Sequence, residues 1–204
     1  MSETRPLEKG DFTRMNLPVE YRKTTRERVP ESVQETIFKY IDQMDLMIRD
    51  GLGFLFYGSA GVGKTSTAAL LAMEARSRGY TTFFVPVSDL REMIRSHVTF
   101  DDSSILDRVR KVRFLVLDGL RAEDARDSLF SGVDLARLME ARTSWKRSTV
   151  ITTSVGLAKV RDELFPSLWE VARTRCASLE FKGKGHRDDQ EDRVRERLGL
   201  KKGG

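Results

Sequence analysis

The residues with the clearest chemistry form one run, Gly58-Ser59-Ala60-Gly61-Val62-Gly63-Lys64-Thr65. This run satisfies the G-x-x-x-x-G-K-[ST] pattern of a phosphate-binding loop. Its glycines let the backbone wrap around a phosphate with N–H groups pointing inward, and the helix expected to follow directs the positive end of its dipole to the same point. Lys64 supplies a charge for the terminal phosphates, and the Thr65 hydroxyl is a ligand for Mg²⁺. We therefore expect residues 58–66, with Ser66 at the end, to bind ATP.

A second acidic position follows a pattern typical of a buried strand. Asp118 comes directly after the apolar run Phe114-Leu115-Val116-Leu117, and an acid at the carboxyl end of such a strand faces the ligand crevice of an α/β sheet. We expect Asp118 and Thr65 to hold Mg²⁺, with Lys64 and Asp118 as catalytic residues. The other interpretation of Asp118 is a cap on the turn that follows.

Gly119 stands where many ATPases carry a second acid, which orients or deprotonates the attacking water. Glu123 and Asp124 lie in the next loop, and Glu123 is the candidate for a replacement base. Hydrolysis is therefore expected to be slow, or to need a group from a partner.

Further polar positions near the end of the chain are candidates to act on the phosphates. Ser154 ends the run Ile151-Thr152-Thr153-Ser154, where a hydroxyl can sense the γ-phosphate or hold the attacking water. The alternative is that these hydroxyls only terminate a strand. Arg173 and Arg175 follow a helical segment, and Arg187 follows the last apolar run. An arginine at the edge of a nucleotide site stabilises transferring charge, from the same chain or from a neighbour.

Five short apolar runs are expected to form the strands that carry these positions: 54–57, 82–87, 113–117, 149–153 and 178–181. Such runs suit strands buried on both faces, and most of the segments between them have helical periodicity. Strands that alternate with helices form a parallel sheet covered on both sides. Before the first run, apolar residues at helical spacing predict one amphipathic helix over residues 31–50. Trp145 and Trp169 also fall within helical patterns, so we expect both to pack against other side chains instead of stacking on nucleic-acid bases.

The chain has 204 residues, of which 39% are hydrophobic and 33% charged, a composition that suits one soluble globular domain. Residues 1–30 are polar and interrupted by prolines, so we interpret them as an arm or linker. A core over residues 31–187 and a charged tail over residues 188–204 follow. The single cysteine, Cys176, excludes an internal disulfide and a cysteine-based metal cluster.

Net charge and hydropathy also indicate which classes of binding partner the protein can have. Lys and Arg number 36 against 31 Asp and Glu, a formal net charge of +5. An excess of basic residues, most of them Arg, fits partners that carry phosphate, such as DNA. Since no apolar run approaches the ~20 residues of a membrane span and no signal peptide is recognisable, we expect a cytoplasmic protein with no membrane partner.

Taken in order, these segments resemble the AAA+ ATPase core of DnaC-type helicase loaders and IstB-type transposition ATPases. The resemblance covers about residues 15–190 and is carried by GLGFLFYGSAGVGKTSTAALLAMEARSRGYTTFFVPVSDLREMIRS, FLVLDGLRAED, LARLMEARTSWKRSTVITTS and LWEVARTRCASLEFKGKGHR. It implies an α/β P-loop NTPase of the ASCE/AAA+ type, with a parallel five-stranded sheet ordered 5-1-4-3-2, flanking helices and no substantial lid domain. By this resemblance Lys64 and Thr65 match the Walker A motif, and Asp118 matches Walker B.

The resemblance also implies that ATP and Mg²⁺ bind at the interface of a homo-oligomer that acts on nucleic acid. Ser154 falls where these proteins usually have Asn, and Gly119 replaces their second acid. The arginine finger is expected near Arg173 and Arg175. These weakened catalytic positions favour an ATP-gated switch over a fast motor.

Four functions are compatible with these features. The first is a DnaC-like helicase loader that binds ATP, Mg²⁺ and DNA and acts as an oligomer on a replicative helicase, in a compact form that would suit a phage or another mobile element. The second is an IstB-like helper that binds duplex DNA and recruits a transposase. The third is a nucleotide-gated scaffold with little hydrolysis, because of Gly119. The fourth, a small-molecule nucleotide kinase, is disfavoured because the sequence has no Asp-Arg-aromatic acceptor motif.

Overall fold

The computed structural model describes residues 4–96, 103–126 and 131–183. Its strands are β1 (Gly53–Tyr57), β2 (Thr82–Pro86), β3 (Phe114–Leu120), β4 (Ser148–Thr153) and β5 (Cys176–Glu180). Its α-helices are α1 (Lys9–Arg14), α2 (Glu31–Asp42), α3 (Met44–Asp50), α4 (Lys64–Ser77), α5 (Val87–Ser96), α6 (Ser103–Lys111), α7 (Gly132–Ser144), α8 (Leu157–Lys159) and α9 (Pro166–Ala172). Shorter helical turns are η1 (Val19–Tyr21), η2 (Arg26–Arg28), η3 (Ala122–Arg126) and η4 (Val160–Leu164).

The five strands form one parallel sheet in the order β2-β3-β4-β1-β5. This order confirms the predicted 5-1-4-3-2 arrangement, and each predicted apolar run overlaps one strand. The central strands β3, β4 and β1 are buried over most of their length, as continuous apolar runs in a covered parallel sheet require.

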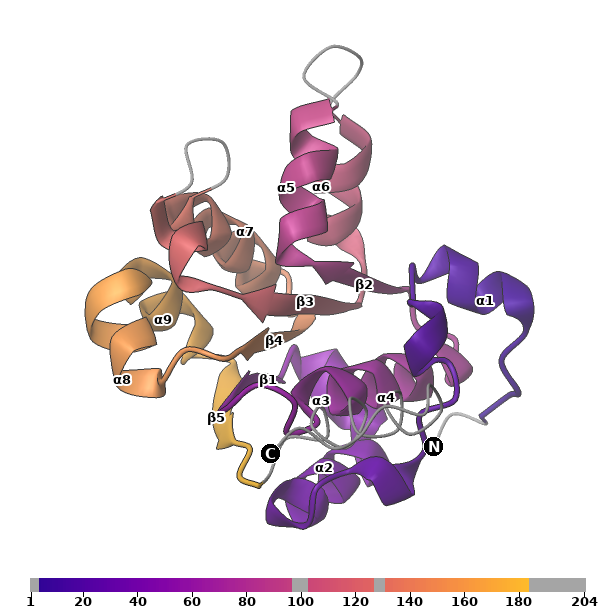
Figure 1. The fold of residues 1–204 in the computed structure, drawn as a ribbon. Helices are drawn as coiled ribbons and strands as arrows, with labels where there is room; N and C mark the ends of the chain where they lie inside the picture. The colour runs from indigo at the N-terminus through magenta and orange to yellow at the C-terminus, as the bar shows by residue number, and fades with distance from the viewer. Residues whose placement is uncertain (1–3, 97–102, 127–130, 184–204) are drawn as a thin grey trace, which may run out of the picture.

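Helices cover both faces of this sheet (Figure 1). On one face, α2, α3 and α4 share a core that includes Ile37 and Phe56. On the other face, α5, α6, α7 and α9 share a core that includes Leu115 and Phe165. α5 and α6 lie side by side and rise away from the sheet beside β2 and β3. Among the described residues, no helix combines the length and the apolar character that a membrane span needs.

The single helix predicted over residues 31–50 is wrong in one respect, because the structure divides it into α2 and α3 at Gln43. Arg78, just after α4, donates a hydrogen bond to the Ile41 carbonyl (3.3 Å) and another to the Met44 sulfur (3.8 Å). The first of these contacts satisfies a carbonyl at the end of α2. The break is therefore stabilised by α4, a partner that local periodicity does not reveal.

The arm before α2 lies against the core and covers the outer edge of β2. The Phe84 backbone N–H donates to the Met15 carbonyl (2.8 Å), and Asn16 Nδ2 donates to the Phe84 carbonyl (3.1 Å). Met15 is fully buried, and the Tyr21 ring lies 6.2 Å from the Phe84 ring. The arm thus occupies hydrogen-bonding groups that an edge strand would otherwise leave open.

A buried carboxylate anchors the start of the arm to α4. Asp11 is 3% exposed, and its oxygens accept hydrogen bonds from Arg5 (2.7 and 2.8 Å) and Arg76 (2.9 Å). These guanidinium groups, Arg5 above all, hold the pKa of the Asp11 carboxyl well below its usual range. Because the folded-state pKa is depressed, the stability that this cluster contributes is present above about pH 4 and is lost as the pH falls below that.

Arg142, at the end of α7, is fully buried and connects three elements. Its Nη1 donates to the carbonyls of Val109 (2.6 Å) and Val112 (3.0 Å), at the end of α6. Its Nη2 and Nε donate to the Ser148 carbonyl (2.6 Å) and the Thr149 hydroxyl (2.8 Å), at the start of β4. Burial lowers the pKa of Arg142 to about 9, so the guanidinium stays charged at neutral pH.

Trp145 does not pack inside, so the expectation from helical spacing is wrong for this residue. α7 ends at Ser144, the backbone of Lys146 is left-handed (φ 47°), and the Trp145 side chain is left 71% exposed. Trp169 does pack against the core beside α7, as expected.

Gly51 and Gly79 provide a matched pair of stability tests, because both follow helices with left-handed backbones (φ 71° and 85°). A Cβ on Gly51 would lie 2.5 Å from the backbone of Lys146, whereas a Cβ on Gly79 would meet nothing within 4 Å. We expect Gly79→Ala to cost about 1 kcal/mol and Gly51→Ala about 3 kcal/mol, because overlap is added to backbone strain. Urea unfolding of both variants measures the difference. Equal costs would show that the Gly51–Lys146 contact is not tight in solution.

Candidate nucleotide-binding site

The loop between β1 and α4 is shaped by three glycines with left-handed backbones: Gly58 (φ 135°), Gly61 (φ 80°) and Gly63 (φ 95°). Gly58 lies so close to the Phe181 carbonyl that a Cβ would come within 2.3 Å of its oxygen. Gly63 is the N-cap of α4, so the first N–H groups of that helix face the loop. The glycines of the sequence motif are therefore required by backbone geometry, and together they build an anion-binding turn.

Lys64 places its charge inside this loop. Only 7% of the residue is exposed, and its ammonium donates to the carbonyls of Gly58 (2.7 Å) and Ser59 (2.5 Å). Because the ammonium is held by the loop's own carbonyls, it is positioned before any ligand binds. An anion in the loop would meet this charge together with the N–H groups at the start of α4.

Asp118 lies on β3, within reach of the same loop. Burial raises the pKa of its carboxyl above the usual value, although hydrogen bonds from the Thr152 and Thr65 hydroxyls and the charge of Lys64 oppose that rise. The Thr152 bond is short, with 2.7 Å between Oγ1 and the Asp118 oxygen. A half-buried carboxylate beside a threonine hydroxyl offers the oxygen ligands that Mg²⁺ prefers. Thr65 and Asp118 therefore fit a Mg²⁺ ion shared with a bound nucleotide.

The backbone conformation at position 119 favours glycine. Its φ is 75°, and the pairing of β3 with β4 shifts register between Leu117 and Leu120. Its N–H donates to the Thr152 hydroxyl (2.9 Å), which in turn donates to Asp118. The bulge at Gly119 therefore helps to orient the hydroxyl that holds the Asp118 carboxylate.

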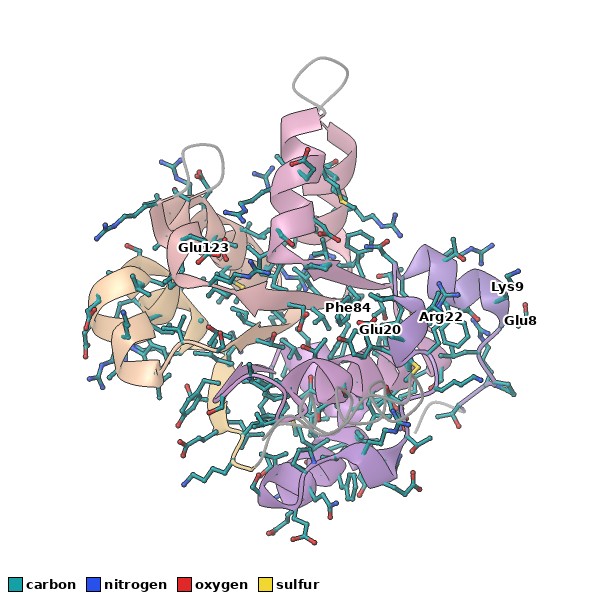
Figure 2. The ribbon with its side chains drawn as sticks, in the orientation of Figure 1. Glu8, Lys9, Glu20, Arg22, Phe84 and Glu123 are labelled. Atoms are coloured by element: carbon teal, nitrogen blue, oxygen red, sulfur yellow. The ribbon has the colours of Figure 1, made fainter. Side chains whose placement is uncertain are left out.

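Glu123 and Asp124 are not brought to Asp118 by any contact of the described residues. The Glu123 side chain is 62% exposed and pairs with Arg121 at 3.4 Å. Asp124 is buried, accepts the Arg121 backbone N–H (2.7 Å) and lies 2.9 Å from Arg91. Asp124 is thus occupied by structural contacts, and Glu123 faces solvent at a distance from the arm in Figure 2.

Glu20, which sequence reasoning missed, is an acid whose charge acts on Asp118. Electrostatic repulsion from Glu20 adds to the rise in the pKa of the Asp118 carboxyl. Glu20 lies on η1 beside Tyr21, which contacts Phe84, and Figure 2 shows Glu20 and Phe84 in the same region. Phe84 is two residues before Pro86, the residue that pairs with Asp118 across β2 and β3. The arm therefore brings a negative charge toward the nucleotide-binding edge, and nothing in the local sequence pattern marks it.

The structure places Ser154 just outside β4, where it is exposed. The hydroxyl that contacts Asp118 belongs to Thr152, and the Thr153 hydroxyl donates to the Leu120 carbonyl (2.7 Å). Of the hydroxyls at the end of β4, Thr152 therefore contacts Asp118 and Thr153 contacts the backbone of β3, whereas the role expected for Ser154 at the γ-phosphate stays a prediction.

Arg173 and Arg175 lie at the opposite edge of the sheet from their own phosphate-binding loop. The Arg175 carbonyl accepts the Gly53 N–H at the start of β1 (2.9 Å), whereas the loop follows the end of β1. Arg175 Nη1 donates to the Asp50 carbonyl (3.2 Å), and Arg173 pairs with Glu170 (2.9 Å). Neither guanidinium meets the nucleotide site of its own chain. Arg187, the remaining candidate, lies outside the described residues.

Replacing Asp118 with Asn should change stability and Mg²⁺ response in opposite directions. The amide keeps the Thr152 contact through its oxygen but removes a charge that partial burial disfavours. We expect the nucleotide-free variant to be more stable by about 1 kcal/mol at pH 7, roughly 2–4 °C in melting temperature, and to lose the extra stabilisation that Mg²⁺ and a nucleotide give together. Thermal unfolding with and without the ligands measures both effects.

The pH dependence supplies the control for this prediction. A raised folded-state pKa means that protonating Asp118 favours the folded form, so the wild type gains stability from this group as the pH falls through that pKa. The advantage of Asp118→Asn should therefore shrink as the pH is lowered from 7 toward 4. An advantage that stays constant over this range would contradict the assignment to Asp118 ionisation.

The sheet order, the phosphate-binding loop after β1 and the acid on β3 together define a P-loop ATP-binding protein of the AAA+ type. A comparison with models of protein families matches residues 31–166 to the IstB-like ATP binding proteins. The match spans more than half of the 204 residues, and the chain belongs to this family.

Comparisons with individual proteins and solved structures agree with this family assignment. The replicative helicase loader DnaC of Escherichia coli (strain K12) is 25% identical over 127 residues, which are 60% of this chain and 49% of that protein. The chain thus spans about half the length of the curated relatives it matches. Among solved structures, that of the DnaC helicase loader has a TM-score of 0.71 at 23% identity and covers 81% of this chain and 100% of that chain. AMPPCP-bound DnaA from Aquifex aeolicus has a TM-score of 0.64 at 17% identity and covers 88% of this chain and 57% of that chain. These likenesses confirm the AAA+ fold.

Proposed function

We propose that this protein is an ATPase of DNA replication or mobility, a DnaC-like helicase loader that binds ATP with Mg²⁺, assembles with copies of itself and holds DNA. The observation that carries the proposal is the grouping of Lys64, Thr65 and Asp118 at one edge of the sheet. Membership of an ATP-binding family and the similarity to DnaC support it. The replicative helicase is the expected partner by that similarity alone.

The residues of the nucleotide-binding site have different roles toward the phosphates of ATP. The loop N–H groups and Lys64 bind and orient the phosphates. Thr65 and Asp118 would hold a Mg²⁺ ion, which would supply positive charge against the negative charge of the phosphates. Thr152 keeps the Asp118 carboxylate in place (2.7 Å). The residue next to Asp118 is Gly119, so the described part of the chain has no second acid there to activate the water that attacks the γ-phosphate. We therefore expect slow ATP hydrolysis.

The arginine finger is proposed to act between chains. Arg173 and Arg175 lie at the amino ends of the strands, away from their own loop, so either one serves only the nucleotide of a neighbouring copy. An ATP site completed by a second copy would make assembly depend on ATP. This arrangement links nucleotide binding to oligomerisation, as a loader requires.

Replacing Lys64 with Ala tests the nucleotide site directly. Charge-assisted hydrogen bonds to phosphate are worth about 1.5–3 kcal/mol each, so we expect ATP affinity to fall by roughly 100-fold. Titration with a fluorescent ATP analogue measures the loss. Lys159→Ala, at an exposed position on α8, is the control and should bind as the wild type does. Unchanged affinity in Lys64→Ala would mean that nucleotide binds elsewhere.

Three linked measurements test the function. The ATPase rate is measured with and without single-stranded DNA, size-exclusion chromatography is run with and without ATP, and DNA retention on filters is followed across a salt series. A loader should show DNA-stimulated turnover, ATP-driven assembly and retention that weakens with salt, because phosphate contacts release counterions. Absence of retention at low salt with ATP present would contradict the DNA-binding part. Binding and assembly without any turnover would instead favour a nucleotide-gated scaffold.

The family match supports a second candidate, an IstB-like helper that prefers duplex DNA and recruits a transposase. Competition between single-stranded and duplex DNA of the same length separates the two. A clear preference for duplex would favour the helper.

A further inference from the structure

Three helices end together at the amino ends of the strands, the edge opposite the phosphate-binding loop. α3 leads into β1, α6 into β3 and α7 into β4. The Ser148 hydroxyl donates to the Met47 carbonyl of α3 (3.4 Å), and Arg113 Nη2 donates to the Ile48 carbonyl (3.4 Å). Arg142 joins the ends of α6 and α7 through its buried hydrogen bonds. The three helix ends are thus parts of one surface.

Basic residues occupy these three helix ends, and the turn after α7 carries an exposed indole. We call the group the amino-end patch: Arg49, Arg110, Lys111, Trp145, Lys146 and Arg147. The Arg49 and Lys111 side chains are 71% and 70% exposed, although each has a carboxylate neighbour, Asp50 and Asp107 respectively. Arg110 and Lys146 are also exposed. Cations beside helix carboxyl ends are stabilised by the helix dipole, which accounts for the charges but not for the indole.

Trp145 is held in its exposed position by the backbone around it. The Arg147 N–H donates to the Arg142 carbonyl (2.9 Å), which closes the left-handed turn at Lys146. The backbone of Gly51 packs against that turn, so closely that a Cβ would not fit between them. A large apolar ring is therefore presented to solvent on a fixed turn, with Lys146 and Arg147 next to it in the chain. Such a ring costs little conformational entropy when a partner stacks on it.

We infer that the amino-end patch binds single-stranded nucleic acid, with a base stacked on Trp145 and phosphates held by Lys146, Arg147 and the neighbouring cations. An aromatic platform within a basic surface is the arrangement that single strands need, because every base has a stacking face and every nucleotide a phosphate. Duplex DNA keeps its bases stacked inside and leaves the indole without a partner. The inference rests on the proposed DNA-binding function and specifies the surface that performs it.

The position of the patch makes this compatible with ATP binding. The patch lies at the amino ends of the strands, and the phosphate-binding loop lies at the carboxyl ends. A strand of DNA on the patch therefore does not compete with nucleotide on the same chain. Arg175, at the start of β5, lies along the same edge, which is where a neighbouring copy would contact the chain.

Fluorescence of Trp145 tests the inference directly, because the chain contains two tryptophans. The variant Trp169→Phe leaves Trp145 as the only indole, and Trp145→Phe leaves only the packed Trp169. Oligo(dT) is titrated into each full-length protein at low salt and again at increasing salt. We expect saturable quenching in Trp169→Phe that weakens with salt, and little change in Trp145→Phe.

Affinity changes provide the second readout. Trp145→Ala should weaken oligo(dT) binding about tenfold or more, since stacking on one aromatic ring is worth that much by alanine substitution. The charge reversal Lys146→Glu with Arg147→Glu should weaken it further and reduce the dependence on salt. Lys159→Glu on α8 is the matched surface control and should leave affinity within about twofold.

The outcomes that would overturn the inference are distinct. DNA retained on filters while Trp145 emission stays unchanged would place the DNA elsewhere and leave the proposed function intact, whereas no retention at all would contradict both. Quenching of Trp145 by ATP that oligo(dT) does not increase further would show that the patch is an interface between copies. Equal quenching by polyglutamate would show an acidic polypeptide site instead of a nucleic-acid site.

Discussion

Replacing Arg142 with Leu should unfold the protein or bring it close to unfolding. Arg142 is fully buried, and its guanidinium is the donor for the carbonyls of Val109, Val112 and Ser148. Each buried carbonyl left unpaired costs about 1–3 kcal/mol, so the total for three carbonyls is at least about 3 kcal/mol. That is a large part of the 5–15 kcal/mol that typically separates folded from unfolded protein.

Two further variants keep the Arg142 prediction measurable if Arg142→Leu cannot be purified. Arg142→Lys keeps the positive charge but loses the planar fork, and we expect a cost of about 2 kcal/mol. Arg137→Leu lies on the same helix, with a side chain 73% exposed beside Asp134, and should change stability by less than about 0.5 kcal/mol. Urea midpoints rank the three proteins. A midpoint for Arg142→Lys equal to that of wild type would show that the buried fork is dispensable.

Much of the fold could be predicted from the sequence because its signals are local and redundant. Each strand is a continuous apolar run, and the phosphate-binding loop combines a fixed spacing with the strand before it and the helix after it. The sequence alone therefore predicts that the loop, Lys64 and Asp118 lie at one edge of the sheet. The order of the strands, in contrast, is implied by the resemblance to the AAA+ core of DnaC-type and IstB-type ATPases and not by these local patterns.

The remaining features depend on contacts that local patterns do not record. The arm segment around Met15 has no periodicity, yet it completes the edge of β2 through Phe84. Trp145 continues the helical spacing of Leu138 and Arg142, but the helix ends one residue earlier, and a turn packed against Gly51 directs the ring outward. In each case the decisive partner is distant in sequence.

The choice between Thr152 and Ser154 illustrates the same limit inside the site. Thr152 and Ser154 are two residues apart, so both would lie on the same side of an extended strand, but β4 ends at Thr153 and Ser154 falls outside it. The Gly119 N–H, on the bulge of β3, donates to the Thr152 hydroxyl, and a left-handed glycine has no signature in the apolar pattern. The sequence therefore predicts hydroxyls near the phosphates at the end of the fourth strand, and the backbone determines that Thr152 is the one that contacts Asp118.

Replacing Gly119 with Glu should raise the rate of ATP hydrolysis while lowering stability. A carboxylate next to Asp118 supplies the base that the described site lacks, and general base catalysis contributes typically 10²–10⁴-fold, so we expect a gain of about tenfold or more even from imperfect placement. The φ of 75° makes any side chain at this position strained, at about 1–2 kcal/mol. Space is available, since a Cβ on Gly119 would meet nothing within 4 Å.

Gly119→Gln is the matched control, because it carries the same strain and nearly the same shape without the charge. Both variants should melt at similarly reduced temperatures, and only Gly119→Glu should hydrolyse ATP faster at saturating ATP and Mg²⁺. Single-turnover rates separate the chemical step from product release. If both variants turn over at the wild-type rate, the missing acid does not limit hydrolysis, and the slow step lies in assembly or in an arginine supplied by a neighbouring copy. If only Gly119→Glu is faster, Gly119 itself keeps ATP hydrolysis slow in the wild type. Gly119 would then have two effects, because its N–H orients the Thr152 hydroxyl that contacts Asp118 and its lack of a carboxylate determines how long ATP remains bound.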